Sequence, residues 1–160
     1  MAEIASETAG EAADPHGGDS TPKLVVERFL DLLRRNEVEQ ATQLLAVDVV
    51  YENIGLPTVR GRKRVRRLFQ AMARPAGAGF EAHLHTISAD GPSVLTERTD
   101  VLKLGRLRAQ FWVCGRFDVR DGEIVLWRDY FDHINVLAAT VRGLLGTVLP
   151  TVRATPPSAA

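Results

Sequence analysis

Residues 107–119, LRAQFWVCGRFDV, and residues 123–132, EIVLWRDYFD, decide the fold of this chain. Most odd-numbered positions in both segments are apolar, and a period of two predicts β-strands with one face toward a core. The intervening Arg120-Asp121-Gly122 has the composition of a turn, so we expect an antiparallel hairpin. Asp129 interrupts the apolar row that runs from Val125 to Phe131 and places a carboxylate on the inward face.

The expected strand register brings Asp129 near two other polar residues. A three-residue hairpin loop with Gly122 in the left-handed conformation would place Val113 of the first strand opposite Asp129. On the preceding predicted strand, Arg98 and Asp100 share a face, and the expected pairing places Arg98 beside Val113. The two acids would then flank one central strand.

This arrangement suggests proton-transfer chemistry. Strands separated by a third strand lie roughly 10 Å apart, a gap that the side chain of Arg98 can span to reach both Asp100 and Asp129. Burying two carboxylates with one guanidinium favours one shared proton, so one acid could accept a proton from water while the other protonates a leaving oxygen. A purely structural ion network is the alternative. The inward-facing Tyr51 and Asn53 favour catalysis, since they could hold a water.

The rest of the chain predicts helices and further strands. Helical or alternating spacing of apolar residues predicts three helices, at residues 22–36, 38–45 and 62–73, and three strands, at residues 47–53, 81–88 and 94–104. The first of these strands is expected to place four residues on one side: Val47, Val49, Tyr51 and Asn53.

The last apolar segment completes the predicted fold. Residues 134–149 are shorter than the ~20 residues of a bilayer span and predict a buried helix, so no membrane span is expected. Helices, then strands, then one helix predict an α+β fold, in which N-terminal helices pack into a strongly curved mixed or antiparallel sheet. We expect a disordered leader at residues 1–20, one domain at residues 21–150 and a flexible tail at residues 151–160.

The composition indicates a globular domain with an uncharged ligand. The chain has 160 residues, 45% of them hydrophobic, and 20 basic residues balance 20 acidic ones. A zero net charge argues against nucleic acid and acidic membranes as partners. Arg60 and the basic residues within 62–73 are interpreted as a solvated face, since no aromatic residues alternate with them. Cys114 is the one cysteine, and the N-terminus lacks a secretory pattern, so we expect a cytoplasmic protein.

Other kinds of site have weaker support. His83 and His85 share a predicted face with Glu81, but without a further ligand they are interpreted as sheet-surface histidines rather than a metal site. The chain contains neither a Gly-rich phosphate loop nor a Gly-x-Ser-x-Gly motif. No metal and no cofactor are therefore expected.

Three motifs in residues 22–149 carry a resemblance to a known family. They are Tyr51-Glu52-Asn53, Glu97-Arg98-Thr99-Asp100-Val101-Leu102 and Trp127-Arg128-Asp129-Tyr130-Phe131-Asp132. In order and spacing they resemble the limonene-1,2-epoxide hydrolase family of the wider NTF2-like, or SnoaL-like, superfamily. The resemblance implies a cone-shaped NTF2-like fold and a cofactor-independent enzyme that is typically a homodimer.

The resemblance also implies a role for each of the five polar residues. Asp129 would deprotonate a water that Tyr51 and Asn53 also hold, while Asp100 would protonate the epoxide oxygen and Arg98 would bridge the acids. The product would be a vicinal diol, formed in one step without a covalent intermediate. The substrate would be a bulky lipophilic epoxide, terpene-like or sterol-like, in a cavity lined by Leu102, Phe111, Val113, Phe131, Val136, Leu137 and Val141.

Two alternatives stay open at this point. One is a ketosteroid-isomerase-like or polyketide-cyclase-like enzyme of the same superfamily, in which a single carboxylate moves protons on a carbon skeleton. The other is a non-catalytic module that binds a ligand or dimerises on the same scaffold, because a fold does not dictate a function. Neither alternative needs Arg98, Asp100 and Asp129 together.

Overall fold

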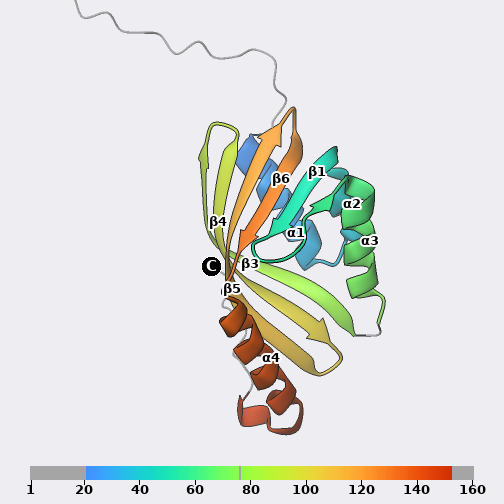
Figure 1. The fold of residues 1–160 in the computed structure, drawn as a ribbon, viewed down its shortest axis with the longest axis vertical. Helices are drawn as coiled ribbons and strands as arrows, with labels where there is room; N and C mark the ends of the chain where they lie inside the picture. Colours follow the sequence, from blue (N-terminus) through green and yellow to red (C-terminus); the bar gives the residue numbers. More distant parts are fainter. Residues whose placement is uncertain (1–20, 76, 153–160) are drawn as a thin grey trace, which may run out of the picture.

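The computed structural model describes residues 21–75 and 77–152 (Figure 1). The helices are α1 (Pro22–Arg34), α2 (Val38–Gln43), α3 (Arg62–Ala73), α4 (His133–Val148) and a short 3-10 helix η1 (Pro150–Val152). The strands are β1 (Leu45–Asn53), β2 (Val59–Arg60), β3 (Ala78–Asp90), β4 (Ser93–Leu104), β5 (Leu107–Arg120) and β6 (Glu123–Tyr130). The predicted leader and most of the predicted tail lie outside the described residues.

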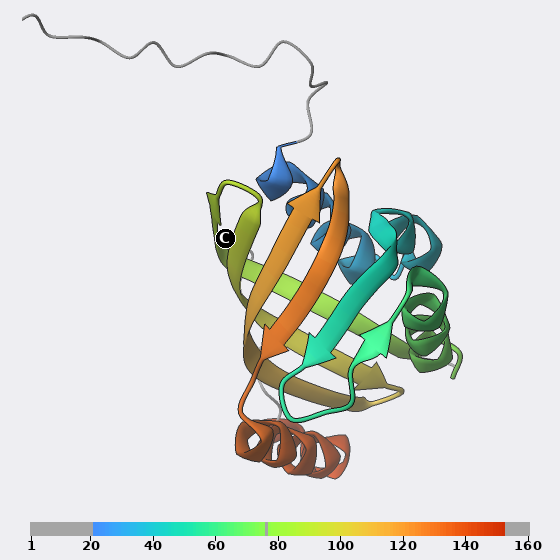
Figure 2. The same ribbon diagram turned by 45° about the horizontal axis from the view of Figure 1, so that its top comes forward.

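The strands form one mixed sheet in the order β2-β1-β6-β5-β4-β3. Neighbours pair antiparallel except β1 and β6, which run parallel. Figures 1 and 2 show the sheet curving around the N-terminal helices, which lie on its inner face, while α4 lies beyond the end of β6. The predicted α+β class, with N-terminal helices, a curved mixed sheet and a C-terminal helix, is confirmed.

Helix α1 shows why the N-terminal segment packs against the sheet. The hydroxyl of Thr21 accepts a hydrogen bond from the backbone N–H of Leu24, and Pro22 occupies the first turn, where no backbone donor is needed. The apolar stripe that follows is buried against the sheet, and Phe29 is fully buried. The ring of Phe29 packs edge-on against Trp127, with their centroids 5.0 Å apart. Trp127 also stacks on Phe117 and so joins α1 to the central strands.

Two predictions about the first strand are wrong. Leu45 belongs to β1 rather than to the helix before it, which ends at Gln43. The pairing of β1 with β6 shifts register between Leu45 and Val50, and this irregularity turns Val47 outward, where 75% of its area is exposed. The two-residue strand β2, which pairs with β1, was not predicted, because the segment around Pro57 has the composition of a loop.

The hairpin between β5 and β6 also differs from the prediction. Arg120 pairs with Glu123, so the loop contains only Asp121 and Gly122, with φ values of 52° and 76°. Two consecutive positive φ values are typical of a type I′ turn, which suits the twist of a hairpin. The register then shifts by one residue within β6, where Val125 is the extra residue.

Helix α4 is not the buried helix that the sequence predicted. Strand β6 pairs with β5 only from Cys114 onward, and α4 packs beside the earlier part of β5. The buried residues of the helix are all small: Ala139, Gly143 and Gly146. A strand edge is too narrow to cover a whole helix, so the larger apolar side chains of α4 stay exposed. No helix within 21–75 or 77–152 has the length and apolarity needed to cross a bilayer.

Candidate active site

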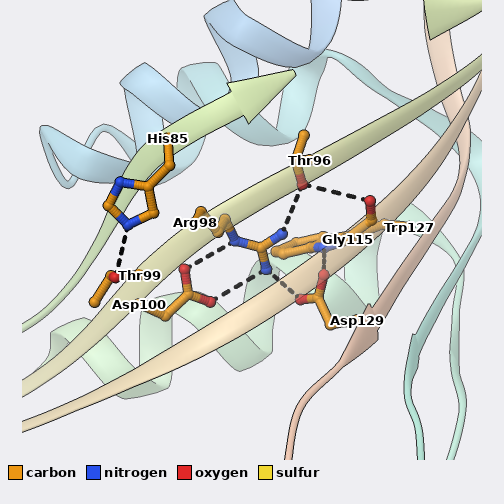
Figure 3. Close-up of polar contacts among 8 residues, drawn as sticks. All are labelled: His85, Thr96, Arg98, Thr99, Asp100, Gly115, Trp127 and Asp129. Atoms are coloured by element: carbon orange, nitrogen blue, oxygen red, sulfur yellow. Dashed lines mark hydrogen bonds and ion pairs between the residues drawn. The ribbon is translucent and has the colours of Figure 1, made fainter. Parts of the chain in front are cut away.

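The guanidinium of Arg98 lies between the carboxylates of Asp100 and Asp129 (Figure 3). Its Nε donates to Oδ1 of Asp100 at 2.8 Å, and its Nη2 donates to Oδ2 of the same residue at 3.1 Å. The same Nη2 lies 2.7 Å from Oδ2 of Asp129. Arg98 is fully buried, and each acid exposes only 3% of its area. The predicted arrangement of two buried acids joined by one guanidinium is therefore present.

The strand register explains how these side chains meet. Arg98 pairs with Val113, as predicted. Asp129 lies opposite Gly115 rather than opposite Val113, and Gly115 in turn lies opposite Thr96 of β4. The predicted register of β6 is thus wrong by two residues. Asp129 still points to the predicted face, because side chains alternate along a strand with a period of two.

Burial and Arg98 act in opposite directions on the two acids. Burial raises the pKa of Asp100 to about 6, with Arg98 lowering it and the charge of Asp129 raising it further. Burial also raises the pKa of Asp129 above its usual range, against the lowering effects of Arg98 and of a hydrogen bond from Trp127. Burial alone would lower the pKa of Arg98, but the two carboxylates outweigh burial and raise it, so the guanidinium stays charged. One cation facing two acids favours a single proton on the pair.

Tyr51 and Asn53 lie on β1, directly beside Trp127 and Asp129 of β6. The ring of Tyr51 packs on Trp127 with centroids 4.2 Å apart, and Tyr51 is buried whereas Asn53 is half-buried. Burial and the charge of Asp129 raise the pKa of Tyr51 well above its usual value, against a hydrogen bond from Asn53 that lowers it. Tyr51 is therefore a neutral phenol near neutral pH, and its hydroxyl can donate a hydrogen bond next to the acids.

Two polar contacts of the site were not predicted. The indole N–H of Trp127 donates to Oδ1 of Asp129 at 2.9 Å, a role that neither the apolar row nor the family motif containing Trp127 predicted. The hydroxyl of Thr96 accepts a hydrogen bond from Nη1 of Arg98 at 3.4 Å. The signal for Trp127 was present in the sequence, because residues two apart on a strand share a face and indole is a hydrogen-bond donor.

Four of the apolar residues expected around a substrate lie on the sheet and the segment after β6. Phe111 pairs with Asp100 across β4 and β5, and its ring lies 5.8 Å from that of Phe131. Leu102 follows Asp100 two residues later on the same strand face. Val113 is fully buried. These four residues therefore form apolar surroundings on the Asp100 side of the site.

The three residues expected from α4 are placed differently. Val136 is half-buried, but Leu137 and Val141 expose 65% and 49% of their areas. The buried side of α4 carries small residues instead. Leu137 and Val141 therefore do not join the group around Arg98 within this chain.

The histidines of β3 belong to surface interactions. Nε2 of His83 lies 3.2 Å from a carboxylate oxygen of Glu81, which also pairs with Lys103. His85 hydrogen-bonds instead to Thr99 on the neighbouring strand at 2.8 Å (Figure 3). In the part of the chain that the structure describes, no three His, Cys, Asp or Glu residues are grouped so as to hold a metal ion.

The geometry of the site suits two simultaneous proton transfers. Asp100 and Asp129 are held on opposite sides of one fixed positive charge, with a tyrosine hydroxyl and an amide beside Asp129. An acid with a raised pKa can donate a proton near neutral pH, and an ionised neighbour can accept one. The group is therefore suited to accept a proton from water and to protonate a leaving oxygen.

Comparisons with known proteins identify the family of this chain. The limonene-1,2-epoxide hydrolase catalytic domain family matches residues 20–142. Epoxide hydrolase EphG of Mycobacterium tuberculosis strain H37Rv is 47% identical over 130 residues, which cover 81% of this chain and 86% of the relative. A solved structure of an M. tuberculosis LEH-like epoxide hydrolase is 45% identical, with a TM-score of 0.79 over 84% of this chain and 95% of that one.

A more distant structure supports the fold alone. An NTF2-like protein of unknown function from Cytophaga hutchinsonii is 17% identical, with a TM-score of 0.64 over 76% of this chain and 99% of that one. The extent of the family match and the identity to EphG decide between the hydrolase and the isomerase, cyclase or binding-module alternatives. The chain belongs to the limonene-1,2-epoxide hydrolase family, has an NTF2-like fold and is an epoxide hydrolase.

Proposed function

We propose that this enzyme adds water to a lipophilic epoxide in one step to give a vicinal diol. Asp129 accepts a proton from a water molecule that Tyr51 and Asn53 also hold, and the water oxygen attacks one epoxide carbon. The bond from that carbon to the epoxide oxygen breaks as Asp100 gives its proton to the oxygen. The water attacks from the side opposite the breaking bond, so the attacked carbon is inverted, and no bond forms between enzyme and substrate.

The observation that carries this proposal is the guanidinium of Arg98 bonded to both acids inside a buried site. It keeps one acid able to give a proton while the other can take one, which is the requirement for general acid and general base catalysis in a single step. A site with a single working carboxylate would not require the second acid to be buried at a cost in desolvation.

The apolar surroundings support a lipophilic substrate. Phe111 lies directly across from Asp100, with Phe131 against it and Leu102 next along β4. We propose that these residues and Val113 line the substrate side of the acid, and that a terpene-like or sterol-like epoxide is the substrate class. Apolar contact area can bind such a molecule, while the few polar groups orient its oxygen.

A single-turnover reaction in water labelled with oxygen-18 tests the mechanism. Excess enzyme is mixed with limonene-1,2-oxide and with bulkier epoxides, and both the diol and the protein are analysed by mass spectrometry. Direct attack by water predicts one labelled oxygen in the diol and none in the protein. Label found in a carboxylate of the enzyme would show a covalent intermediate and contradict the proposal.

We also propose that the enzyme is a homodimer that uses the exposed stripe of α4. Leu137, Val141, Leu144 and Val148 recur at helical spacing, and each exposes about half or more of its area. Light scattering during gel filtration should give twice the chain mass. Leu144→Glu and Val148→Glu should shift it to the monomer, whereas Leu95→Glu, at an exposed position of β4, should not. A monomeric parent protein would contradict the proposal.

We propose a cytoplasmic location from the cysteine usage. Disulfides form and persist in secreted proteins, whereas Cys114 is the one cysteine of the chain and has no second cysteine to pair with in it. Fractionation of the source cells with an antibody against the protein would test this, and recovery mainly outside the cytoplasmic fraction would contradict it.

A further inference from the structure

Strand β5 separates the two acids, so any group that links them must cross it. Asp100 is on β4 and Asp129 is on β6, and the residue of β5 on the row of Asp129 is Gly115. The flanking inward positions of β5 are filled by Val113 and Phe117, both fully buried. Gly115 is thus a gap without a side chain in an otherwise filled row.

The gap at Gly115 is occupied by the guanidinium of Arg98. A Cβ atom at Gly115 would overlap Nη1 of Arg98 and would lie 2.7 Å from Oγ1 of Thr96 and 3.1 Å from Oδ1 of Asp129. The φ angle of Gly115 lies outside the left-handed region, so its backbone conformation does not itself require glycine. The need for glycine here comes from the close approach of these three polar side chains.

The surroundings of the guanidinium leave it one way to make room for a side chain at Gly115, which is to move away from Asp129. Arg98 is fully buried, its Nε and Nη2 are bonded to Asp100, and its carbon Cζ lies 6.0 Å from the ring centroid of Phe117. A side chain at Gly115 would therefore push the guanidinium away from Asp129. Arg98 and Asp100 are both on β4, so the guanidinium does not need to cross β5 to contact Asp100.

We propose that Gly115 is a positioning residue for the proton transfers, because its missing side chain gives the guanidinium of Arg98 a passage across β5 to Asp129. This inference rests on the proposed function and adds to it a residue that touches no substrate. Its role is to let one cation reach both acids, so that Asp100 and Asp129 behave as a pair.

Loss of this passage has a defined electrostatic consequence. Asp129 would keep its burial and its hydrogen bond from Trp127 but lose the nearest positive charge, so its pKa would rise. The other titratable groups facing it, Tyr51 and Asp100, supply no positive charge in exchange. An acid that is protonated over a wider range of pH is less often in the carboxylate form that accepts a proton from water.

The first test compares Gly115→Ala with Gly79→Ala. Gly79 is also a buried strand glycine, but an added Cβ there would meet only the flexible end of Lys103, at 3.3 Å. With limonene-1,2-oxide, Gly115→Ala should lower kcat at least ~100-fold, as expected for loss of acid–base alignment, with a smaller change in KM. The acidic limb of its pH profile should move to higher pH. Gly79→Ala should keep both the rate and the profile, and an unshifted profile in Gly115→Ala would overturn the inference.

A double-variant cycle covers the possibility that Gly115→Ala folds poorly. If the gap at Gly115 serves to accommodate the guanidinium, Gly115→Ala should lower the melting temperature strongly in the parent protein. The same substitution should lower it little when combined with Arg98→Met. The combined variant should therefore melt near the temperature of Arg98→Met alone. An equal loss from Gly115→Ala in both backgrounds would show that the gap serves some other packing need, and would overturn the inference.

A titration without substrate separates this inference from the proposed function. Carbon-13 NMR of labelled aspartate carboxylates should show two coupled titrations in the parent protein. In Gly115→Ala, or in Gly115→Ser if the alanine variant is unstable, the coupling should be lost and the pKa of Asp129 raised. If the parent makes no diol from any epoxide, the proposed function fails while this titration still decides the role of Gly115. Coupling unchanged in the variant would overturn that role.

Discussion

The chain contains the same Arg-x-Asp pattern twice on neighbouring strands, and the two copies behave differently. Arg98 contacts Asp100 through Nε and Nη2 at 2.8 and 3.1 Å, and Arg116 contacts Asp118 through the same atoms at 3.0 and 3.1 Å. The first pair is buried, with side-chain exposures of 0% and 5%, whereas the second exposes 41% and 26%.

The protonation of the two acids follows their surroundings. Burial raises the pKa of Asp100 to about 6 despite its arginine. Burial also acts on Asp118, but hydrogen bonds from Arg116 and Ser93 outweigh it and lower the pKa of that acid. The comparison teaches that the sequence motif alone does not raise the pKa of an acid, whereas a desolvated position next to a second acid does.

Replacing the acids should give the largest difference between the two regions. Asp100→Asn and Asp129→Asn should each lower kcat for diol formation by ~10³-fold or more, because each removes one half of the proton transfers. Asp118→Asn alters the exposed copy and should leave the rate within about twofold, since solvent screens that pair. Initial rates with limonene-1,2-oxide measure all three, and equal losses at Asp100 and Asp118 would break the comparison.

Replacing the arginines should separate the regions in stability. Arg98→Met leaves two buried acids without a cation and should lower the free energy of unfolding by about 3–5 kcal/mol, the usual cost of breaking a buried ion pair. Arg116→Met should change it little, because that side chain is partly exposed to solvent, which screens the pair. Urea unfolding followed by circular dichroism measures both. Similar losses in the two variants would show that burial is not what distinguishes the pairs.

The pH dependence of stability should have opposite signs in the two regions. The folded protein holds a proton on Asp100 that the unfolded chain releases, so stability should fall as pH rises from 3.8 to about 6, with a slope near ~1.4 kcal/mol per pH unit. Asp118 has a lowered pKa, so its contribution is present at higher pH and lost on acidification. Urea midpoints measured across this range should lose the first slope in Asp100→Asn. If the slope remains in Asp100→Asn, a group other than Asp100 causes it.

The smallest difference in kcat is expected between variants of the two tryptophans that donate to carboxylates. Trp127→Phe removes the N–H bonded to Asp129 and should lower kcat about tenfold, the worth of one hydrogen bond to a charged group, with the acidic limb moving to higher pH. Trp112→Phe removes a similar bond of 3.1 Å to Glu97 on the surface and should leave rate and profile unchanged. A shifted profile in Trp112→Phe would contradict the assignment.

The grouping of the site residues could be predicted more accurately than the strand register, because side chains alternate between the two faces of a strand. Arg120-Asp121-Gly122 fits both a two-residue and a three-residue hairpin loop, and the sequence does not choose between them. The real loop and the bulge at Val125 together move Asp129 by two positions relative to β5. A shift of two leaves Asp129 on the same face, so the grouping of the acids was predicted correctly while its partner on β5 was not.

The placement of α4 and the outward turn of Val47 could not be predicted for a different reason. Apolar composition indicates that residues 134–149 avoid water, but not how much of the helix its neighbour can cover. That depends on β6 ending at Tyr130 while β5 continues, a difference in strand length with no local signal. The outward turn of Val47 likewise follows from pairing with β6, which is distant in the sequence.

Trp127 links the stability of the fold to the rate of the reaction. The same indole that packs against Phe29, Phe69 and Phe117 also donates a hydrogen bond to Asp129, the base of the proposed mechanism, so residues that stabilise the fold and residues that support activity are not separate sets. Substitutions far from any epoxide, for example on α1, would alter turnover through the tilt of this ring. Selection for a faster enzyme and selection for a more stable one therefore act on a shared set of positions.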